Sequence, residues 1–132
     1  LEGDAAPYQN ACRIAKFVDL PAIEFVKGYF PGTQPGTFDV TFAFAVSHWA
    51  YQYWPGQPEW PDIIKAFADV TREHLFMEYI AAEDEMLQTH RPRKDLGTYG
   101  GEYFQAALTQ HFSSVRELDT VKPTRRIFLA SK

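Results

Sequence analysis

The chain has 132 residues, enough for one domain, and 45% of them are hydrophobic, enough for a packed core. The net charge of −4 argues against a broad basic surface for nucleic acid. The single cysteine, Cys12, excludes an internal disulfide. No apolar run approaches the ~18 residues of a membrane helix, and no secretory signal precedes the fold. A cytoplasmic protein is therefore expected.

The first part of the chain predicts one helix and two strands. Apolar residues recur with helical spacing and mark one helix face: Tyr8, Ala11, Cys12, Ala15 and Val18. A short strand is expected over Ala22–Val26, followed by a loop rich in glycine and proline. Phe38–Val46 is the clearest strand, because it is apolar nearly throughout, as is typical of a central strand covered on both faces.

The middle of the chain continues the alternation of strands and helices. Ser47-His48-Trp49 is expected as a turn at the carboxyl end of the strand, and residues 51–61 as a loop rich in aromatics, proline and glycine. A second helix is expected from Trp60 to Thr71, followed by a buried strand over His74–Ala81.

The last part of the chain predicts a polar connection, a helix and a hairpin. Glu83–Gly101 is the polar connection, and its acidic run at 83–85 is typical of a solvated loop. The third helix is expected over Glu102–Phe112, and the last strands over Ser114–Leu118 and Arg126–Ala130. This alternation predicts an α/β sheet with helices on both faces and an antiparallel β-hairpin at its end.

The order of these segments resembles that of class I S-adenosylmethionine-dependent methyltransferases. Gly3-Asp4 is similar to the end of that family's second strand. Phe38-Asp39-Val40 through Ser47-His48-Trp49 is similar to its fourth strand and the active-site turn after it, and His74–Ile80 is similar to its fifth strand. His111–Val115 with Thr124–Ala130 is similar to its closing hairpin. The resemblance implies a single partial domain over residues 1–132, with a Rossmann-like methyltransferase sheet flanked by helices, and S-adenosyl-L-methionine as the cofactor.

The chain departs from the family pattern in its donor-binding half. The family's first strand and glycine-rich donor loop would lie upstream of Gly3-Asp4, and Gly28-Tyr29 stands where an acid usually contacts adenine. The implied sheet is therefore incomplete at its N-terminus, which leaves a hydrophobic strand as an exposed edge. Because the first residue is Leu1, we expect an additional N-terminal segment, or a second chain, to complete the sheet.

The resemblance assigns the cofactor-binding and catalytic positions. Asp4 is expected to accept hydrogen bonds from the ribose hydroxyls, Tyr29 either to stack on adenine or to fill space, and Ser47 to line the donor site. His48 is the candidate general base, since its reference pKa is about 6.5. The alternative for His48 is a histidine held by hydrogen bonds within the core.

Other residues near the same turn are candidates for binding the methyl acceptor. They are Trp49, Tyr53, Trp54 and Glu78. Tyr53 and Trp54, with Tyr51 and Trp60, form either a lid over an apolar pocket or a cluster that closes over the second helix. Trp49 either forms a wall against the sulfonium or the acceptor, by cation–π attraction, or belongs to the core. Glu78 either faces the acceptor or pairs with an arginine. The four histidines and one cysteine show no zinc spacing, so no metal is expected.

The function expected from these residues is methyl transfer to a small-molecule or sugar-like acceptor, because an activated sulfonium needs mainly alignment with its acceptor. The alternative is a non-catalytic module of methyltransferase-like fold, which the lack of a donor loop favours. A third possibility is half of a nucleotide-binding dehydrogenase, but the closing hairpin argues against it.

Overall fold

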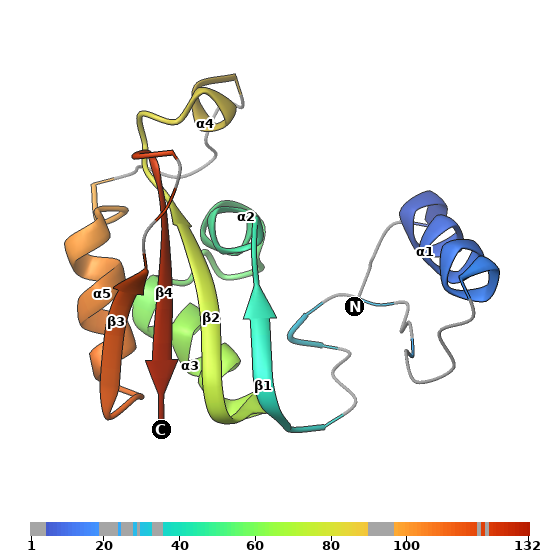
Figure 1. Cartoon of the computed structure of the whole chain (residues 1–132). Coiled ribbons are helices and arrows are strands. Elements are labelled where there is room, and N and C mark those ends of the chain that lie inside the picture. Colours follow the sequence, from blue (N-terminus) through green and yellow to red (C-terminus); the bar gives the residue numbers. More distant parts are fainter. Residues whose placement is uncertain are drawn as a thin grey trace. The chain divides into compact units, whose positions relative to one another are not determined.

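The computed structural model describes residues 5–18, 24, 28, 30–32, 36–89, 97–118, 120 and 122–132. The chain divides into two compact units, Leu1–Gly36 and Thr37–Lys132. Helix α1 belongs to the first unit, and the sheet with the remaining helices belongs to the second (Figure 1). Whether both units form one domain stays a prediction.

The described part of the first unit holds one helix, α1 (Ala5–Phe17). Its half-buried residues are Tyr8, Ala11, Cys12 and Ala15. These are four of the five residues that helical spacing places on one face, and the predicted face is confirmed for them. The fifth, Val18, follows the helix and is 49% exposed. The strand expected over Ala22–Val26 lies almost entirely outside the described residues.

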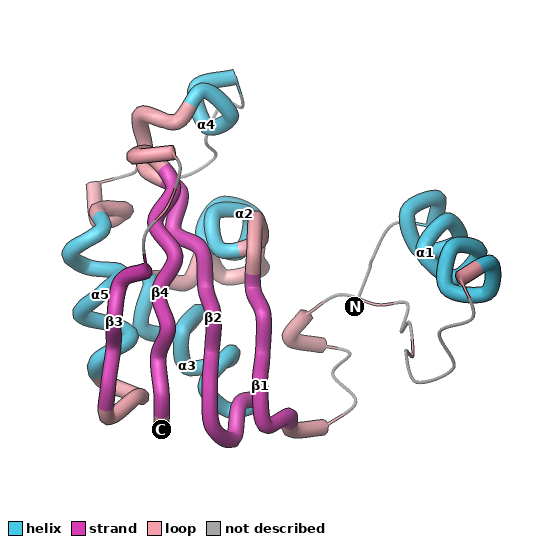
Figure 2. The backbone as a smooth tube through the Cα atoms, in the orientation of Figure 1, coloured by secondary structure: helices cyan, strands magenta, loops and turns pink. Residues whose placement is uncertain are grey.

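A four-stranded mixed sheet forms the second unit, and its strands run side by side in Figure 2. The strands are β1 (Phe38–Ala43), β2 (Thr71–Ile80), β3 (Ser114–Leu118) and β4 (Arg125–Ser131). Their order is β1-β2-β4-β3; β1 is parallel to β2, and β4 is antiparallel to both of its neighbours. The predicted α/β class and the closing antiparallel hairpin are therefore confirmed.

The helices of the second unit pack on one face of this sheet and beyond its strand ends. They are α2 (Ser47–Tyr53), α3 (Trp60–Val70), α4 (Glu85–Thr89) and α5 (Gly101–Thr109). Helix α3 contacts β1, β2 and α5, and α5 contacts β3. In Figure 1 α3 and α5 lie behind the sheet, α2 and α4 lie toward the upper ends of the strands, and no described helix of this unit covers the front of the sheet. The expectation of helices on both faces is therefore not met by the described residues.

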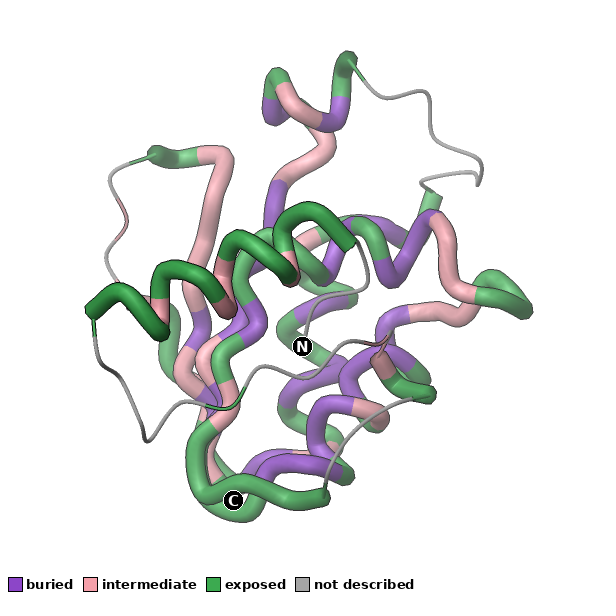
Figure 3. The backbone as a smooth tube through the Cα atoms, turned by 90° about the vertical axis from the view of Figure 1, so that its right-hand side faces the viewer, coloured by how far each residue is buried: buried purple, intermediate pink, exposed green. Residues whose placement is uncertain are grey.

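The two faces of the sheet differ in burial, and Figure 3 shows how buried and exposed residues are distributed along the backbone. On the helix face Leu75, Met77 and Phe128 are completely buried. On the opposite face Phe42 pairs laterally with Phe76, the two rings stack with centroids 5.0 Å apart, and Phe42 is 64% exposed. The residues of β1 on that face, Phe38, Val40 and Phe42, are apolar and 42%, 40% and 64% exposed. Within the described sheet β1 is therefore an edge strand and not the doubly covered strand that its sequence suggested.

Two element boundaries differ from the sequence prediction for local reasons. Strand β1 ends at Ala43 and not at Val46, because Ala45 adopts a φ of +54°, which extended backbone cannot have. Strand β2 begins at Thr71, directly after α3. The hydroxyl of Thr71 donates to Phe67 O at 2.8 Å, which satisfies a carbonyl in the last turn of α3 at the point where the strand starts.

Candidate functional site

The candidate site lies where β1 and β2 end. Because the two strands are parallel, their carboxyl ends meet at the same edge of the sheet. Ligands of open α/β sheets bind outside this edge. The segment Ala45–His48 follows β1 there, and Glu78 lies three residues from the start of the loop after β2.

Glu78 holds the turn that follows β1. The backbone N–H of Ala45 donates to Glu78 Oε2 at 2.7 Å, and the Ser47 hydroxyl donates to Glu78 O at 2.5 Å. Both Ser47 and Glu78 are buried, at 0% and 8% exposure. Glu78 accepts a hydrogen bond from each end of this three-residue turn, so the orientation of the turn is defined.

The second carboxylate oxygen of Glu78 faces a cation. Arg125 Nη1, at the start of β4, lies 3.8 Å from Glu78 Oε1. The structure thus contains the pairing with an arginine that was one of the two alternatives for Glu78. Contact between Glu78 and an acceptor stays a prediction. Through these bonds Glu78 connects β2 with the turn after β1 and with β4.

The Ser47-His48-Trp49 segment is the first turn of helix α2 and not the expected turn followed by a loop. The buried residues of α2 are Ser47, His48, Ala50, Tyr51 and Gln52. These residues lie on the side of the helix that packs against β2 and α3. The sequence prediction was wrong here because a seven-residue segment with polar residues on its buried face has no clear helical period.

His48 and Trp49 differ sharply in access to solvent. His48 is 2% exposed, whereas Trp49 is 42% exposed, and their ring centroids are 5.3 Å apart. The Trp49 ring also packs on Tyr53, with centroids 4.8 Å apart. The structure therefore brings these predicted residues together as an exposed aromatic pair beside a buried imidazole. A general base must reach the proton that it removes. A catalytic role for His48 therefore requires an acceptor that passes the Trp49 and Tyr53 rings and contacts the imidazole.

The aromatic residues that sequence reasoning grouped with a lid separate into two sets. Trp54 stacks on Phe67 of α3 with centroids 6.2 Å apart, as expected for a cluster that closes over the second helix. Tyr51 and Trp60 are 0% and 1% exposed, and their rings lie 4.7 Å apart. These two are core residues, and a lid role for them is wrong because they are covered completely.

Tyr51 belongs to a hydrogen-bonded group that ties three segments together. Its hydroxyl donates to Glu59 Oε2 at 3.0 Å and lies 2.5 Å from Thr98 Oγ1. Thr98 Oγ1 in turn donates to the same Glu59 oxygen at 2.5 Å. The loop before α5 is therefore fixed to α2 and to the residue that precedes α3.

Two predicted residues lie outside the described part of the chain, namely Asp4 and Tyr29 of the expected donor site. Within the described part, no group of three or more histidine, cysteine, aspartate or glutamate side chains is arranged to hold a metal ion. None of the described helices is long and apolar enough to span a bilayer.

The chain was compared with models of known protein families, with curated proteins and with solved structures. None of the three comparisons found a match. The local geometry of the site therefore carries the functional interpretation.

Asp84 is an important residue that the sequence did not reveal. It is 1% exposed, and it accepts hydrogen bonds from Thr124 Oγ1 at 2.6 Å, from Arg125 Nε at 3.3 Å and from Met86 N at 3.0 Å. Lys122 Nζ lies 3.1 Å from the same carboxylate. The hydrogen bond from Thr124, followed by those from Arg125, Met86 and Lys122, holds the pKa of Asp84 well below its usual range despite burial. Asp84 therefore anchors the loop after β2 to the start of β4.

We expect Ala45→Gly to raise the free energy of unfolding by about 0.5–1 kcal/mol, because a side chain at positive φ is strained and glycine relieves that strain. Ala45 has a φ of +54° in the turn that Glu78 holds. Urea denaturation measures the effect. Ala106→Gly, at an exposed position inside α5, is the control and should lower stability by about 1 kcal/mol. A destabilised Ala45→Gly variant would contradict the strain.

Proposed function

We propose that this protein transfers a methyl group from S-adenosyl-L-methionine to a small-molecule or sugar-like acceptor, and that the described sheet forms the acceptor side of the site. Two features support the proposal. The α/β sheet ends in an antiparallel hairpin, as the resemblance to class I methyltransferases implies. A fixed turn with aromatic neighbours lies at the carboxyl ends of two parallel strands.

The observation on which the proposal depends most is the double attachment of the turn after β1 to Glu78, at 2.7 and 2.5 Å. Methyl transfer requires donor and acceptor to be aligned for in-line displacement, and a rigid turn at the ligand-binding edge provides alignment. In this proposal Trp49, Tyr53 and Trp54 line the acceptor site, and Ser47 helps to fix the turn beside the donor.

The donor side of the site and the proton transfer complete the proposal. Asp4 and Tyr29 are proposed to hold the ribose and the adenine of the donor. His48 is proposed to remove a proton where the acceptor must lose one. Its burial limits this role to acceptors that insert beside Trp49 and reach the ring. A cytoplasmic location and a Rossmann-like methyltransferase sheet are parts of the same proposal.

Calorimetric titration of the native protein with S-adenosylhomocysteine tests the donor site. We expect binding, and we expect Asp4→Asn to weaken it by at least about tenfold, because a charged acceptor of ribose hydrogen bonds is lost. Glu2→Gln removes a charge two residues away and should leave the affinity unchanged. Absence of binding to the unmodified protein would overturn the proposal.

A non-catalytic partner module is the second candidate function, and the uncovered face of the sheet favours it. Val40, Phe42 and Phe44 are 40%, 64% and 46% exposed. Exposed apolar patches on soluble proteins usually mark sites of interaction with another molecule or segment. Among the described residues β1 pairs with β2 alone. In this reading, as in the first, a further polypeptide segment or a second chain completes the sheet beside β1. The titration separates the two functions, since a module without a donor site does not bind S-adenosylhomocysteine.

A further inference from the structure

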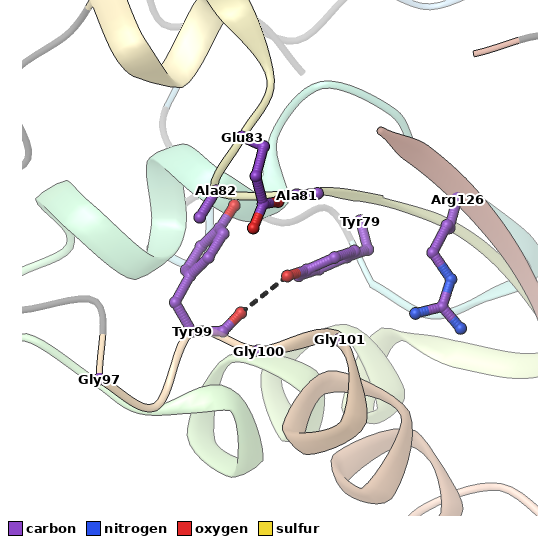
Figure 4. A pocket seen from close by; sticks show the side chains of 9 residues that line it. All are labelled: Tyr79, Ala81, Ala82, Glu83, Gly97, Tyr99, Gly100, Gly101 and Arg126. Atoms are coloured by element: carbon purple, nitrogen blue, oxygen red, sulfur yellow. Dashed lines mark hydrogen bonds between the residues drawn. The ribbon is translucent and has the colours of Figure 1, made fainter. Parts of the chain in front are cut away.

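A pocket of about 390 Å³ opens at the carboxyl end of β2, beside the start of α5 (Figure 4). Tyr79, Glu83, Tyr99, Gly101 and Arg126 contribute to its lining. Its volume is in the range of small-molecule binding sites. None of these residues belongs to the turn that the proposed function uses, so the pocket calls for a separate explanation.

The two tyrosines give the pocket a fixed aromatic wall. The Tyr79 hydroxyl donates to Tyr99 O at 3.0 Å, the bond drawn as a dashed line in Figure 4, and the Tyr99 hydroxyl donates to Ile80 O at 2.8 Å. Both side chains are buried, with residual exposures of 4% and 1%. Because both hydroxyls are already bonded and both rings are almost fully covered, a ligand meets only the small exposed edge of this wall and no unbonded hydroxyl.

Arg126 gives the pocket an oriented cation. Its Nε and Nη2 donate to the two carboxylate oxygens of Glu117 at 2.8 and 2.6 Å, which fixes the plane of the guanidinium. The remaining nitrogen, Nη1, lies over Gly101, where a Cβ atom would be only 2.5 Å from it. Within the described residues Nη1 makes no hydrogen bond. It lies beside Gly101, which lines the pocket, so its N–H groups remain available to a ligand.

Glu83 gives the pocket an anion on another side. It follows β2, it is exposed, and its carboxylate is directed toward the space beside Tyr79 in Figure 4. Burial raises the pKa of Tyr79, the charge of Glu83 raises it further, and the charge of Arg126 lowers it, so both charges act on the same hydroxyl. A simple anion in the pocket would be repelled by Glu83, and a simple cation by Arg126.

We propose that this pocket binds a small zwitterion with the chemistry of a free α-amino acid, its carboxylate on Arg126 Nη1, its ammonium group on Glu83 and its side chain along the Tyr79 ring. Each end of such a ligand meets an opposite charge, and its apolar part covers the aromatic wall. The inference does not rest on methyl transfer, because it concerns binding alone.

The test is calorimetric titration of the full chain with L-phenylalanine and L-leucine. L-Phenylalanine methyl ester, which lacks the carboxylate, and hydrocinnamate, which lacks the ammonium group, are the matched probes. We expect both amino acids to bind and both matched probes to bind at least about tenfold more weakly, since each loses one charge-assisted contact.

One glycine variant tests the position of the ligand. Gly101→Ala introduces a methyl group against Arg126 Nη1 and should weaken binding of L-phenylalanine at least about tenfold, while alanine favours the helix. Gln105→Ala, at an exposed position of the same helix and outside the pocket lining, is the control. Glu83→Ala should weaken binding, and Glu85→Ala, an exposed acid nearby, should not. Circular dichroism confirms that each variant is folded.

Three results would overturn the inference. The first is that neither amino acid binds at concentrations up to about 10 mM, which corresponds to less than about 3 kcal/mol of binding free energy. The second is that hydrocinnamate binds as tightly as L-phenylalanine, which would indicate a plain anion site. The third is that Gly101→Ala binds L-phenylalanine as well as the natural chain and Gln105→Ala do.

Discussion

Asp84→Asn is expected to lower the free energy of unfolding by about 3 kcal/mol, because removing one partner of a buried charge network leaves the others without a counter-charge. The carboxylate is buried, and its partners Thr124, Arg125 and Lys122 lie within 2.6–3.4 Å of it. This loss of stability should lie at the lower end of the range for broken buried ion pairs. The reason is that Arg125 and Lys122 are 31% and 50% exposed, so their charged groups can turn toward water.

Urea denaturation followed by circular dichroism measures this loss. Asp69→Asn is the matched control, because it removes an aspartate that pairs with Lys65 at 2.7 Å on the exposed side of α3, where both side chains are about 60% exposed. Surface pairs of this kind contribute little, so the control should change stability by less than about 0.5 kcal/mol. Equal effects of the two variants would show that the Asp84 network is not structural.

The pH dependence of stability should change in the same variant. The folded state lowers the pKa of Asp84 from its ordinary value, which is close to 3.8. The folded state therefore binds this proton more weakly than the unfolded state, so the stabilisation is complete above the unfolded pKa and is lost as the pH falls below it. The free energy of unfolding should decrease below about pH 4–5, and it should decrease less in Asp84→Asn.

Glu117 makes a separate contribution to this acid dependence. Its pKa is lowered by the hydrogen bonds from Arg126, and the variant leaves that pair intact. The difference between the two proteins at each pH therefore isolates Asp84. Acid profiles that run parallel would contradict a lowered pKa for Asp84.

The role of Asp84 illustrates where sequence reasoning reached its limit. The run of three acids at 83–85 is typical of a solvated loop. Glu83 and Glu85 are exposed as that prediction requires, although Glu85 begins helix α4 and does not lie in a loop. Asp84 differs only because Thr124 and Arg125 reach it from 40 and 41 residues away in the sequence. No local pattern contains that information, because the partners are brought together by the antiparallel pairing of β4 with β2.

The described strands were predictable from their residue types and from their place in the alternation of strands and helices, although β1 and β3 are exposed at most of their positions. Four of the segments expected as strands became β1, β2, β3 and β4. The two short helices, α2 and α4, were not predictable. With seven and five residues they are too short for a helical period, and their existence depends on tertiary contacts such as the burial of Tyr51 and Leu87.

The candidate site was predictable in its position but not in its mechanics. The sequence placed Ser47, His48 and Trp49 at the end of a strand, where open-sheet ligands bind. It could not show that Glu78 accepts from Ala45 N, since 33 residues separate the two. The donor residues Asp4 and Tyr29 lie outside the described residues, so their part of the site stays a prediction.

Glu78→Ala is expected to lower the free energy of unfolding by about 2 kcal/mol and to displace the turn after β1. The variant removes the acceptor of the Ala45 N–H and the counter-charge of Arg125. A partly buried donor without a partner is unfavourable by about 1–3 kcal/mol. Glu78→Gln keeps an oxygen that can accept from Ala45 but loses the charge, so its effect should be smaller.

A double-mutant cycle with Ala45→Gly distinguishes a held turn from a general loss of packing. If Glu78 stabilises the positive φ of Ala45, removing the carboxylate should be less harmful when glycine already adopts that conformation freely. We therefore expect Glu78→Ala to lower stability by at least about 0.5 kcal/mol less in the Ala45→Gly background than in the natural chain. Glu73→Ala, at an exposed position of the same strand, should be nearly neutral in both backgrounds. Strict additivity would mean that the carboxylate and the turn are independent, and the alignment on which the proposed methyl transfer depends would then lack its support.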